Sequence, residues 1–264
     1  MNQNKKCHFS NARLLLGILL LCLLPAGRVN AAMTSQDLEL FKNANSLYYS
    51  EKYDGAEKIY SELHKKYPEY GAVAYNLGNA YYRLGKMGRA ILSYERALQR
   101  EPRNRDIERN LEQAKAELSY KIEDKRNWYL KAAEISLQKF TEDEISSVLA
   151  LSYFLFAASL VLPLFLGKGL RFGLVQKILI VLLLSMTAVY AAKRVEVRVI
   201  RDAIVMSKKA EVRFGPSDGD RVAFKLGEGL KVYVVKSRSD WSRIILTNGE
   251  DGWIKNSSIA EVAV

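Results

Sequence analysis

The chain has 264 residues, which is enough for one large domain or two small ones, and a formal net charge of +11 at pH 7. A charge of this size favours a nucleic-acid partner when a soluble domain carries it. Residues 33–145, however, contain 19 basic and 19 acidic side chains. Most of the excess lies in segments typical of targeting and membrane insertion, so the composition argues against nucleic-acid binding.

Residues 1–31 have the layout of a secretory signal peptide. Basic residues precede the apolar run at 14–24, and Ala31 closes a small-residue cleavage site. The apolar run is too short to span a bilayer as a helix. Both cysteines, Cys7 and Cys22, lie in this segment. We therefore expect a mature chain without disulfides or catalytic thiols.

Residues 32–140 predict an all-α domain built from two helix–turn–helix repeats. Several residue types recur after 34 positions: Tyr48 and Tyr82, Ala56 and Ala90, Tyr60 and Tyr94, Pro68 and Pro102. This period is typical of tetratricopeptide repeats, in which small residues let paired helices approach closely. A third copy begins at Asn110 and then fails. We expect its apolar residues Leu111, Ala114, Leu118 and Ile122 to form one helical stripe that caps the second repeat.

Two apolar stretches follow and predict transmembrane helices at residues 141–167 and 172–192. Residues 145–167 contain no charged side chain, and the second stretch contains only Lys177. Thr141 and Glu144 have the spacing of a capping box at the start of the first helix. The linker between the stretches is short enough to predict a hairpin, which would return the chain to the side of the membrane from which it came.

Residues 198–264 predict a small all-β barrel. Short β-branched runs alternate with turn residues, and Asn248-Gly249 favours a hairpin. The pieces VRFGPSDGD, FKLGEGLKVYV and GEDGWI, together with Trp241, are similar to the bacterial SH3 domain. The whole chain is thus expected to be a multidomain protein: a tetratricopeptide repeat domain, two transmembrane helices and an SH3-like barrel.

The aromatic residues of the barrel divide into surface and core candidates. Phe214 lies beside Gly215-Pro216 in a loop, so we expect it to be exposed, and we assign Phe214 and Trp241 to the SH3-like surface. The alternative for Trp241 is a position in the hydrophobic core of the barrel. We expect Tyr233 and Trp253 to belong to the core, because a domain of about sixty residues without disulfides or metal needs most of its aromatic side chains for packing.

The sequence predicts no catalytic residue, no metal site and no cofactor. Outside the predicted signal peptide it has one histidine, His64, and no cysteine, so these residue types cannot form a metal site. It has no glycine-rich phosphate loop followed by Lys-Ser/Thr. The acidic cluster at residues 142–144 is explained by charges in the first turn of a helix. The features that remain favour binding over catalysis.

The first helix of each repeat is expected to line a concave groove that binds partner proteins. Aromatic residues combined with Asn and Arg are typical of protein-binding surfaces. The candidate residues are Phe41, Asn45, Tyr48, Tyr49, Tyr75, Asn79, Tyr82 and Arg83. For Tyr48 and Tyr82, simple packing between units is an equal alternative. A basic clamp for a C-terminal carboxylate is not expected, because Phe41, Asp106 and Asn110 stand where Lys or Arg is required.

The order of signal peptide, two repeats, membrane hairpin and SH3-like barrel resembles the BatE family of the Bacteroides aerotolerance operon. The resemblance implies a non-enzymatic adaptor in a bacterial envelope complex, with membrane proteins bearing von Willebrand A domains as partners and a link to oxidative-stress tolerance. The predicted signal peptide and the two apolar stretches, rather than the resemblance, predict a location in the cytoplasmic (inner) membrane with periplasmic soluble domains. The alternative is a wall-binding module whose barrel holds peptidoglycan.

The basic residues near the two apolar stretches give a divided signal about topology. Lys168, Arg171 and Lys177 favour a cytoplasmic location for the short linker under the positive-inside rule. Lys193, Arg194, Arg198 and Arg201, opposed only by Glu196, would favour the reverse. The signal peptide decides for a periplasmic location of both soluble domains. The alternative is an uncleaved N-terminus with both domains in the cytoplasm.

Overall fold

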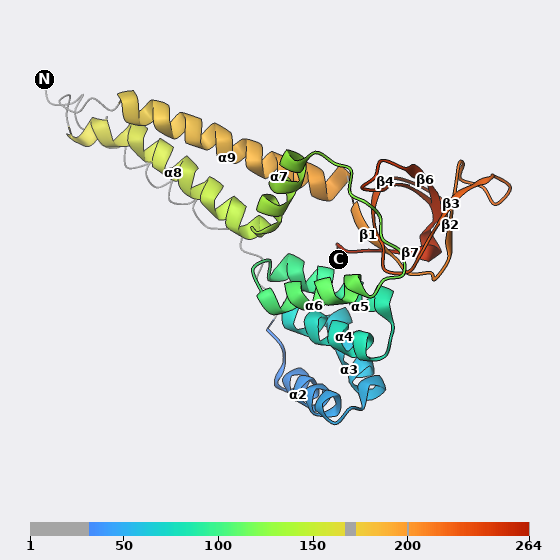
Figure 1. Cartoon of the computed structure of the whole chain (residues 1–264). Coiled ribbons are helices and arrows are strands. Elements are labelled where there is room, and N and C mark those ends of the chain that lie inside the picture. The colour runs from blue at the N-terminus through green and yellow to red at the C-terminus, as the bar shows by residue number, and fades with distance from the viewer. Residues whose placement is uncertain (1–31, 167–172, 200, 264) are drawn as a thin grey trace, which may run out of the picture. The chain divides into compact units, whose positions relative to one another are not determined.

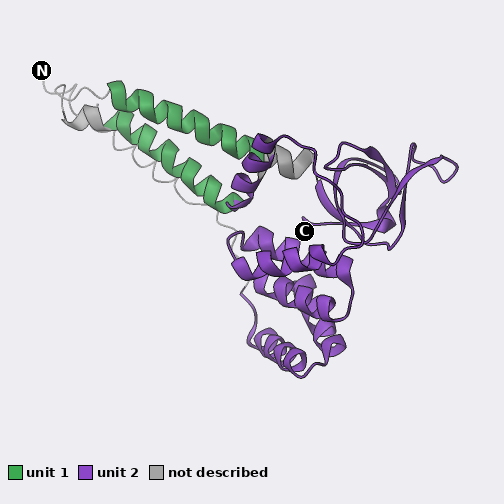
Figure 2. Cartoon of the chain, viewed as in Figure 1, with its two compact units in different colours: residues 1–29, 142–194 green, residues 30–141, 195–264 purple. Residues whose placement is uncertain are grey.

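The computed structural model describes residues 32–166, 173–199 and 201–263 (Figure 1). The predicted signal peptide and the predicted hairpin turn at 167–171 lie outside the described residues. The described chain divides into two compact units (Figure 2). One unit holds residues 142–194, and the other combines residues 32–141 with residues from 195 onward. The repeats and the C-terminal strands, which the apolar stretches separate in sequence, therefore belong to the same unit.

Helices α2 to α6 form the repeat region. α2 (Ser35–Tyr49) packs on α3 (Tyr53–Lys66), α4 (Gly71–Arg83) packs on α5 (Met87–Arg100), and α6 (Arg105–Ala116) packs on α5. The side chain of Thr34 caps α2 by accepting a hydrogen bond from the amide of Asp37, and Asn104 caps α6 in the same way through the amide of Asp106. Pro68 and Pro102 follow α3 and α5 at the same offset, where proline cannot continue a helix.

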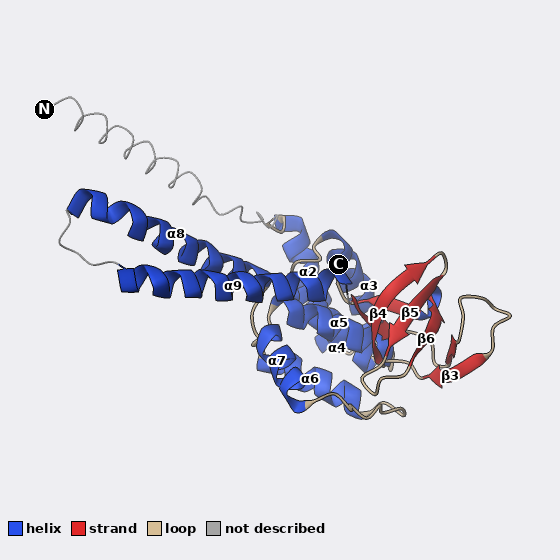
Figure 3. Ribbon diagram, turned by 90° about the horizontal axis from the view of Figure 1, so that it is seen from above, coloured by secondary structure: helices blue, strands red, loops and turns tan. Residues whose placement is uncertain are grey.

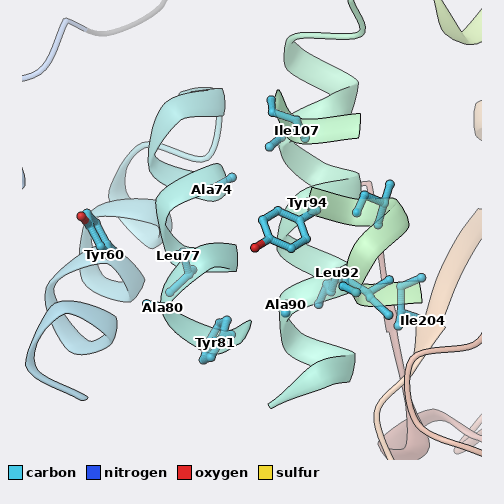
Figure 4. Close-up of a cluster of buried hydrophobic side chains, with 14 of the residues drawn as sticks. Tyr60, Ala74, Leu77, Ala80, Tyr81, Ala90, Leu92, Tyr94, Ile107 and Ile204 are labelled. Atoms are coloured by element: carbon cyan, nitrogen blue, oxygen red, sulfur yellow. The ribbon is translucent and has the colours of Figure 1, made fainter. Parts of the chain in front are cut away.

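Small residues and tyrosines fill the space between these helices, as the 34-residue pattern predicts. Ala44, Ala56 and Ala90 are completely buried, and so are the rings of Tyr60 and Tyr94 to within 1% (Figure 4). A Cβ atom added to Gly78 would lie 2.6 Å from Cε1 of Tyr94. Glycine at this position therefore lets α4 approach the Tyr94 ring more closely than any other residue would allow.

Helix α6 ends earlier than the sequence pattern predicts. It stops at Ala116, whereas Leu118 and Ile122 lie in an irregular segment, so the prediction of one continuous helical stripe is wrong at its C-terminal end. Ile107, Leu111 and Ala114 pack in the helical core. Leu118 touches both this core and that of the β domain, and Ile122 packs against the β core. Ile122 thus packs on the barrel, and Leu118 bridges the helical core and the barrel.

Seven strands form one antiparallel sheet that curls into a barrel, which confirms the predicted small all-β domain (Figures 1 and 3). The strands are β1 (Arg201–Val205), β2 (Ala210–Arg213), β3 (Val222–Leu226), β4 (Lys231–Arg238), β5 (Trp241–Ile245), β6 (Asp251–Lys255) and β7 (Ile259–Glu261), with a 3-10 turn at Asn256–Ser258. Their order in the sheet is β3-β2-β6-β5-β4-β1-β7. The Asn248-Gly249 turn joins β5 to β6, as predicted.

The repeats and the barrel share apolar packing. Ile204 of β1 and Val262 are buried in the same cluster as the helical residues, and Figure 4 shows Ile204 near Leu92 of α5. Gly88, at the start of α5, is also part of this contact. A Cβ atom there would lie 2.7 Å from Cγ of Glu228 and 3.1 Å from the carbonyl oxygen of Val205, so a larger residue would displace Glu228 from this contact.

Polar groups join the same two surfaces. Arg96 donates hydrogen bonds to the carbonyl oxygens of Glu261 (2.9 Å) and Val262 (3.3 Å), and the Gly88 amide donates to Oε1 of Glu228 (2.9 Å). The buried carboxylate of Glu95 in α5 pairs with Lys231 of β4. We call this combined apolar and polar interface the repeat–barrel contact. It joins two segments that are distant in sequence within one compact unit.

Three helices lie between the repeats and the barrel in sequence: α7 (Trp128–Gln138), α8 (Glu142–Leu166) and α9 (Gly173–Val199). α8 and α9 include stretches of 20 and 21 residues, Glu142–Val161 and Gly173–Lys193, that are long and apolar enough to cross a membrane. They run alongside each other (Figure 3), and Nε2 of Gln176 donates to the carbonyl oxygen of Ser159 at 3.2 Å. The predicted fold class of repeats, two apolar helices and a β domain is confirmed.

Candidate functional site

In the first repeat, the side-chain amide of Asn45, a predicted groove residue, supports the packing of the repeat itself. Its Oδ1 accepts a hydrogen bond from the hydroxyl of Tyr60 at 2.6 Å and from Nδ2 of Asn76 at 3.1 Å. Burial raises the pKa of Tyr60, which keeps its hydroxyl protonated as a donor. A buried hydroxyl needs such an acceptor, so Asn45 links α2 to α3 and α4.

The second repeat reproduces this arrangement 34 residues later. Oδ1 of Asn79 accepts from the hydroxyl of Tyr94 at 2.8 Å and from Nδ2 of Asn110 at 2.9 Å. Asn110 also donates to the hydroxyl of Tyr75 at 3.0 Å. Burial raises the pKa of Tyr94 as it does that of Tyr60. The third, incomplete copy therefore contributes Asn110 to the groove in the place that Asn76 takes in the second.

A cavity of about 220 Å³ opens next to this second network. It is lined by Tyr48, Asn79, Tyr82, Arg83, Tyr94, Asn110 and Gln113, and we call it the groove cavity. It brings together four of the predicted groove residues from two repeats. Among the described residues, the amide nitrogen of Asn79 has no hydrogen-bond partner, since only its oxygen is engaged. The cavity thus offers a free donor beside three aromatic rings and a guanidinium.

Tyr82 and Arg83 form the rim of the groove cavity. The hydroxyl of Tyr82 donates to Glu117 and accepts from Nε2 of Gln113 at 2.8 Å. The hydrogen bond to the Glu117 carboxylate raises the pKa of Tyr82. Arg83 is exposed, donates to the hydroxyl of Tyr53 at 2.5 Å, and lies 4.9 Å from the centroid of that ring. Tyr82 therefore packs against the next helix, while Arg83 keeps contact with solvent.

The other predicted groove residues lie outside the cavity lining. Phe41 packs edge-on against Tyr60 with a centroid distance of 5.9 Å, and Tyr75 accepts the bond from Asn110. Tyr49 is 83% exposed and contacts Tyr48 edge-on. Asn110 and Gln113 also line the cavity, although neither is among the predicted groove residues. The 34-residue spacing from Asn76 could have identified Asn110, whereas Gln113 carries no repeat signal.

The barrel presents one exposed aromatic residue and one covered one. Phe214 is 64% exposed, as predicted, and the guanidinium of Arg221 lies 5.2 Å from its ring centroid. Trp241 is only 8% exposed, so it does not present an open surface. The ammonium group of Lys255 lies 5.5 Å from the Trp241 ring and covers it. Lys255 also forms an ion pair of 2.7 Å with Asp218 in the loop that carries Phe214.

The predicted core positions of Tyr233 and Trp253 are not confirmed, because both rings are half-buried. Neighbours in the same strands explain why. Val232 and Val234 point into the barrel core, and so does Ile254 beside Gly252. Side chains alternate along a strand, so Tyr233 and Trp253 fall on the outer face.

His64 is a packing residue of α3. It is buried, its Nδ1 has no hydrogen-bond partner, and burial lowers its pKa to about 4, with Arg96 and Arg100 adding to the effect. A neutral imidazole surrounded in this way is typical of a structural histidine. Within the described ranges, no group of three or more His, Cys, Asp or Glu side chains is placed to hold a metal ion.

The geometry describes two binding-type surfaces on one chain: a groove between helical repeats, and a small antiparallel barrel with an aromatic loop. Residues 41–105 match the tetratricopeptide repeat family, and residues 207–261 match the bacterial SH3 domain family. Both are families of non-catalytic binding domains. A search of curated proteins finds no match to the chain.

Proposed function

We propose that the protein is a membrane-anchored, non-enzymatic adaptor that binds partner proteins through its repeat groove. The groove cavity supports this proposal. Its buried tyrosine hydroxyls already have hydrogen-bond acceptors within the protein. The side-chain amide nitrogen of Asn79 and the positive charge of Arg83 therefore remain available to a ligand. Such a lining suits a segment of extended chain with carbonyl oxygens and an acidic side chain. The resemblance to the BatE family suggests membrane proteins with von Willebrand A domains as partners, in an envelope complex linked to aerotolerance.

The proposed location is the cytoplasmic membrane, with the repeats and the barrel on its periplasmic side. The repeat–barrel contact supports a common side, because Ile204 and Val262 cannot pack among the helices across a bilayer. The chain must then cross the membrane an even number of times between residues 141 and 201. The two apolar helices supply that number.

Co-purification from mild detergent tests the adaptor role. We expect Arg83→Ala and Gln113→Ala to reduce the recovery of partner proteins, because both residues line the cavity and neither supports a buried hydroxyl of Tyr60 or Tyr94. Asn45 and Asn79 are poorer choices, because their replacement would also unsatisfy those tyrosines. Lys58→Ala, an exposed residue of α3, is the matched control. Full recovery of partners with Arg83→Ala and Gln113→Ala combined would exclude the groove cavity as the binding site.

A second candidate function is peptidoglycan binding by the barrel. The exposed ring of Phe214 beside Arg221 favours it, because an aromatic face with a neighbouring cation suits a polar wall polymer. The full-length protein should then sediment with purified cell wall, and Phe214→Ala should weaken the binding. Retention of partner proteins by the same variant would separate the two functions.

A further inference from the structure

Helix α7 exposes large apolar side chains that no part of the described chain covers. The exposed fractions are 80% for Trp128, 53% for Tyr129 and 56% for Ile135, with 51% for Phe140 just beyond the helix. Water is a poor solvent for such a group of neighbouring side chains. The exposure at α7 therefore points to a partner of some kind.

The exposed residues occupy one side of α7. Residues four, seven and eleven positions apart lie on the same face of a helix, which aligns Trp128, Ala132 and Ile135 in one row. Tyr129 and Ala133 form the adjacent row. All five side chains are exposed. The exposed Ser136 follows Tyr129 and Ala133 in the second row, so the helix presents a largely apolar face of two rows.

The chain itself limits what can lie next to this face. α7 ends at Gln138, and the apolar helix α8 begins at Glu142. Phe140 is two residues from Glu142, so at most about 7 Å of chain separates their Cα atoms. If α8 crosses a membrane, Phe140 lies at the membrane boundary. The whole of α7 is only about 16 Å long, so its first residue is also within reach of that boundary.

We propose that α7 lies in the headgroup region of the lipid bilayer, with Trp128, Tyr129 and Ile135 inserted among the lipids. This inference rests on the proposed membrane anchoring. Tryptophan and tyrosine favour this region, because each ring has an apolar body and a polar edge. The exposed cations Lys125 and Lys139 flank the helix and would meet anionic headgroups. The bilayer is therefore a better partner for α7 than bulk water.

Site-directed spin labelling of the full chain in lipid nanodiscs tests this placement. With Cys7→Ser and Cys22→Ser the chain has no other cysteine, so single labels can be attached at Trp128→Cys and Ile135→Cys. Tyr49→Cys is the matched control, an exposed aromatic position in the repeats, and Leu184→Cys in α9 reports the bilayer interior. We expect the ratio of oxygen to nickel-chelate accessibility at 128 and 135 to exceed that at 49 by roughly fivefold or more.

Each other outcome has a distinct meaning. Ratios at 128 and 135 equal to that at 49, with high oxygen access at 184, would overturn the inference and leave the membrane anchor intact. Low access of both reagents at 128 and 135 would mean that protein covers α7, either a second copy or a partner, and would also overturn it. High nickel access at 184 would instead refute the anchoring on which the inference rests.

A second measurement avoids new cysteines in case the labels disturb α7. Trp128 is one of three tryptophans, and the other two, Trp241 and Trp253, lie in the barrel. Lipids brominated near the headgroup should quench part of the emission of the wild-type protein. Trp128→Phe keeps an aromatic ring and should abolish that quenched component. Unchanged quenching in Trp128→Phe would contradict the proposal.

Discussion

Glu95 in helix α5 forms an ion pair of 3.3 Å with Lys231 in strand β4, although 136 residues separate them in sequence. Glu95 also pairs with Lys115 at 2.7 Å, and Lys231 with Asp202 at 2.7 Å. Burial pushes the pKa of Glu95 upward, but the two lysines outweigh it and hold the pKa well below its usual range. The carboxylate therefore stays charged at the centre of the repeat–barrel contact.

Replacement of Glu95 by Ala should destabilise the full-length protein. It would leave the largely buried Lys231 with Asp202 as its remaining ion-pair partner and remove the partner of the more exposed Lys115, at a cost of about 3 kcal/mol. Thermal unfolding in detergent would measure the loss. Glu39→Ala, which removes an exposed ion pair with Lys42, should change stability by less than about 0.5 kcal/mol. Equal effects of the two variants would mean that the Glu95 cluster does not stabilise the contact.

Stability should fall as the pH drops from about 6.5 towards 4.5. The pKa of His64 is about 4 in the folded protein and near 6.5 when exposed, so the unfolded state binds the proton first. Stability from neutral His64 is complete above pH 6.5 and decreases below it, by roughly 2 kcal/mol at pH 4.5. Denaturation at several pH values would measure this slope. His64→Leu should flatten it, whereas the same slope in that variant would assign the pH dependence to other groups.

Gly78→Ala should destabilise the repeats even though alanine favours helices. The new Cβ atom would lie 2.6 Å from the buried ring of Tyr94, and overpacking of this kind costs about 1–3 kcal/mol. Gly55→Ala is the control, because its Cβ would meet only the flexible end of Leu47 at 3.3 Å. Unfolding followed by circular dichroism should show a loss for Gly78→Ala and little change for Gly55→Ala. The opposite order would show that α4 can shift away from Tyr94.

Trp241→Ala should destabilise the barrel, while Phe214→Ala should not. Trp241 is buried beneath Lys255, and its removal leaves a cavity that costs about 3 kcal/mol. Phe214 is exposed in a loop, where substitutions change stability by about 0.5 kcal/mol or less. The unfolding midpoints of the two variants provide the comparison. A stable Trp241→Ala protein would restore Trp241 as a candidate for the binding surface.

The repeats and the barrel should be accessible from the same side of the membrane. In the Cys7→Ser and Cys22→Ser background, single cysteines at the exposed positions Lys58 and Lys236 should both react with a membrane-impermeant thiol reagent added to spheroplasts. Labelling of both supports the periplasmic topology, and labelling of neither supports the cytoplasmic alternative. Labelling of one alone would contradict the common side that the repeat–barrel contact requires.

Local sequence signals predicted the architecture of each segment. The 34-residue recurrence predicted which alanines and tyrosines pack between the helices, because helix pairing depends on side-chain size at fixed spacing. Alternating β-branched runs and the Asn248-Gly249 turn predicted the strands, and the lengths of the two apolar stretches predicted long apolar helices. These signals are contained within segments of ten to forty residues.

Side-chain contacts between distant segments emerge only in the folded protein. Leu118 and Ile122 continue a helical pattern in sequence, yet they leave the helix because the barrel offers them an apolar partner. The sequence predicted that Asn45 and Asn79 bind a ligand. In the structure, their side-chain oxygens accept hydrogen bonds from buried tyrosine hydroxyls. In the sequence, Glu95 resembles any surface charge of an amphipathic helix. In the structure it is bound by Lys231, which lies in a strand 136 residues away. Contacts between such distant segments produce no periodic pattern in a single sequence, because each segment has the residue pattern of its own helix or strand whether or not the other is present.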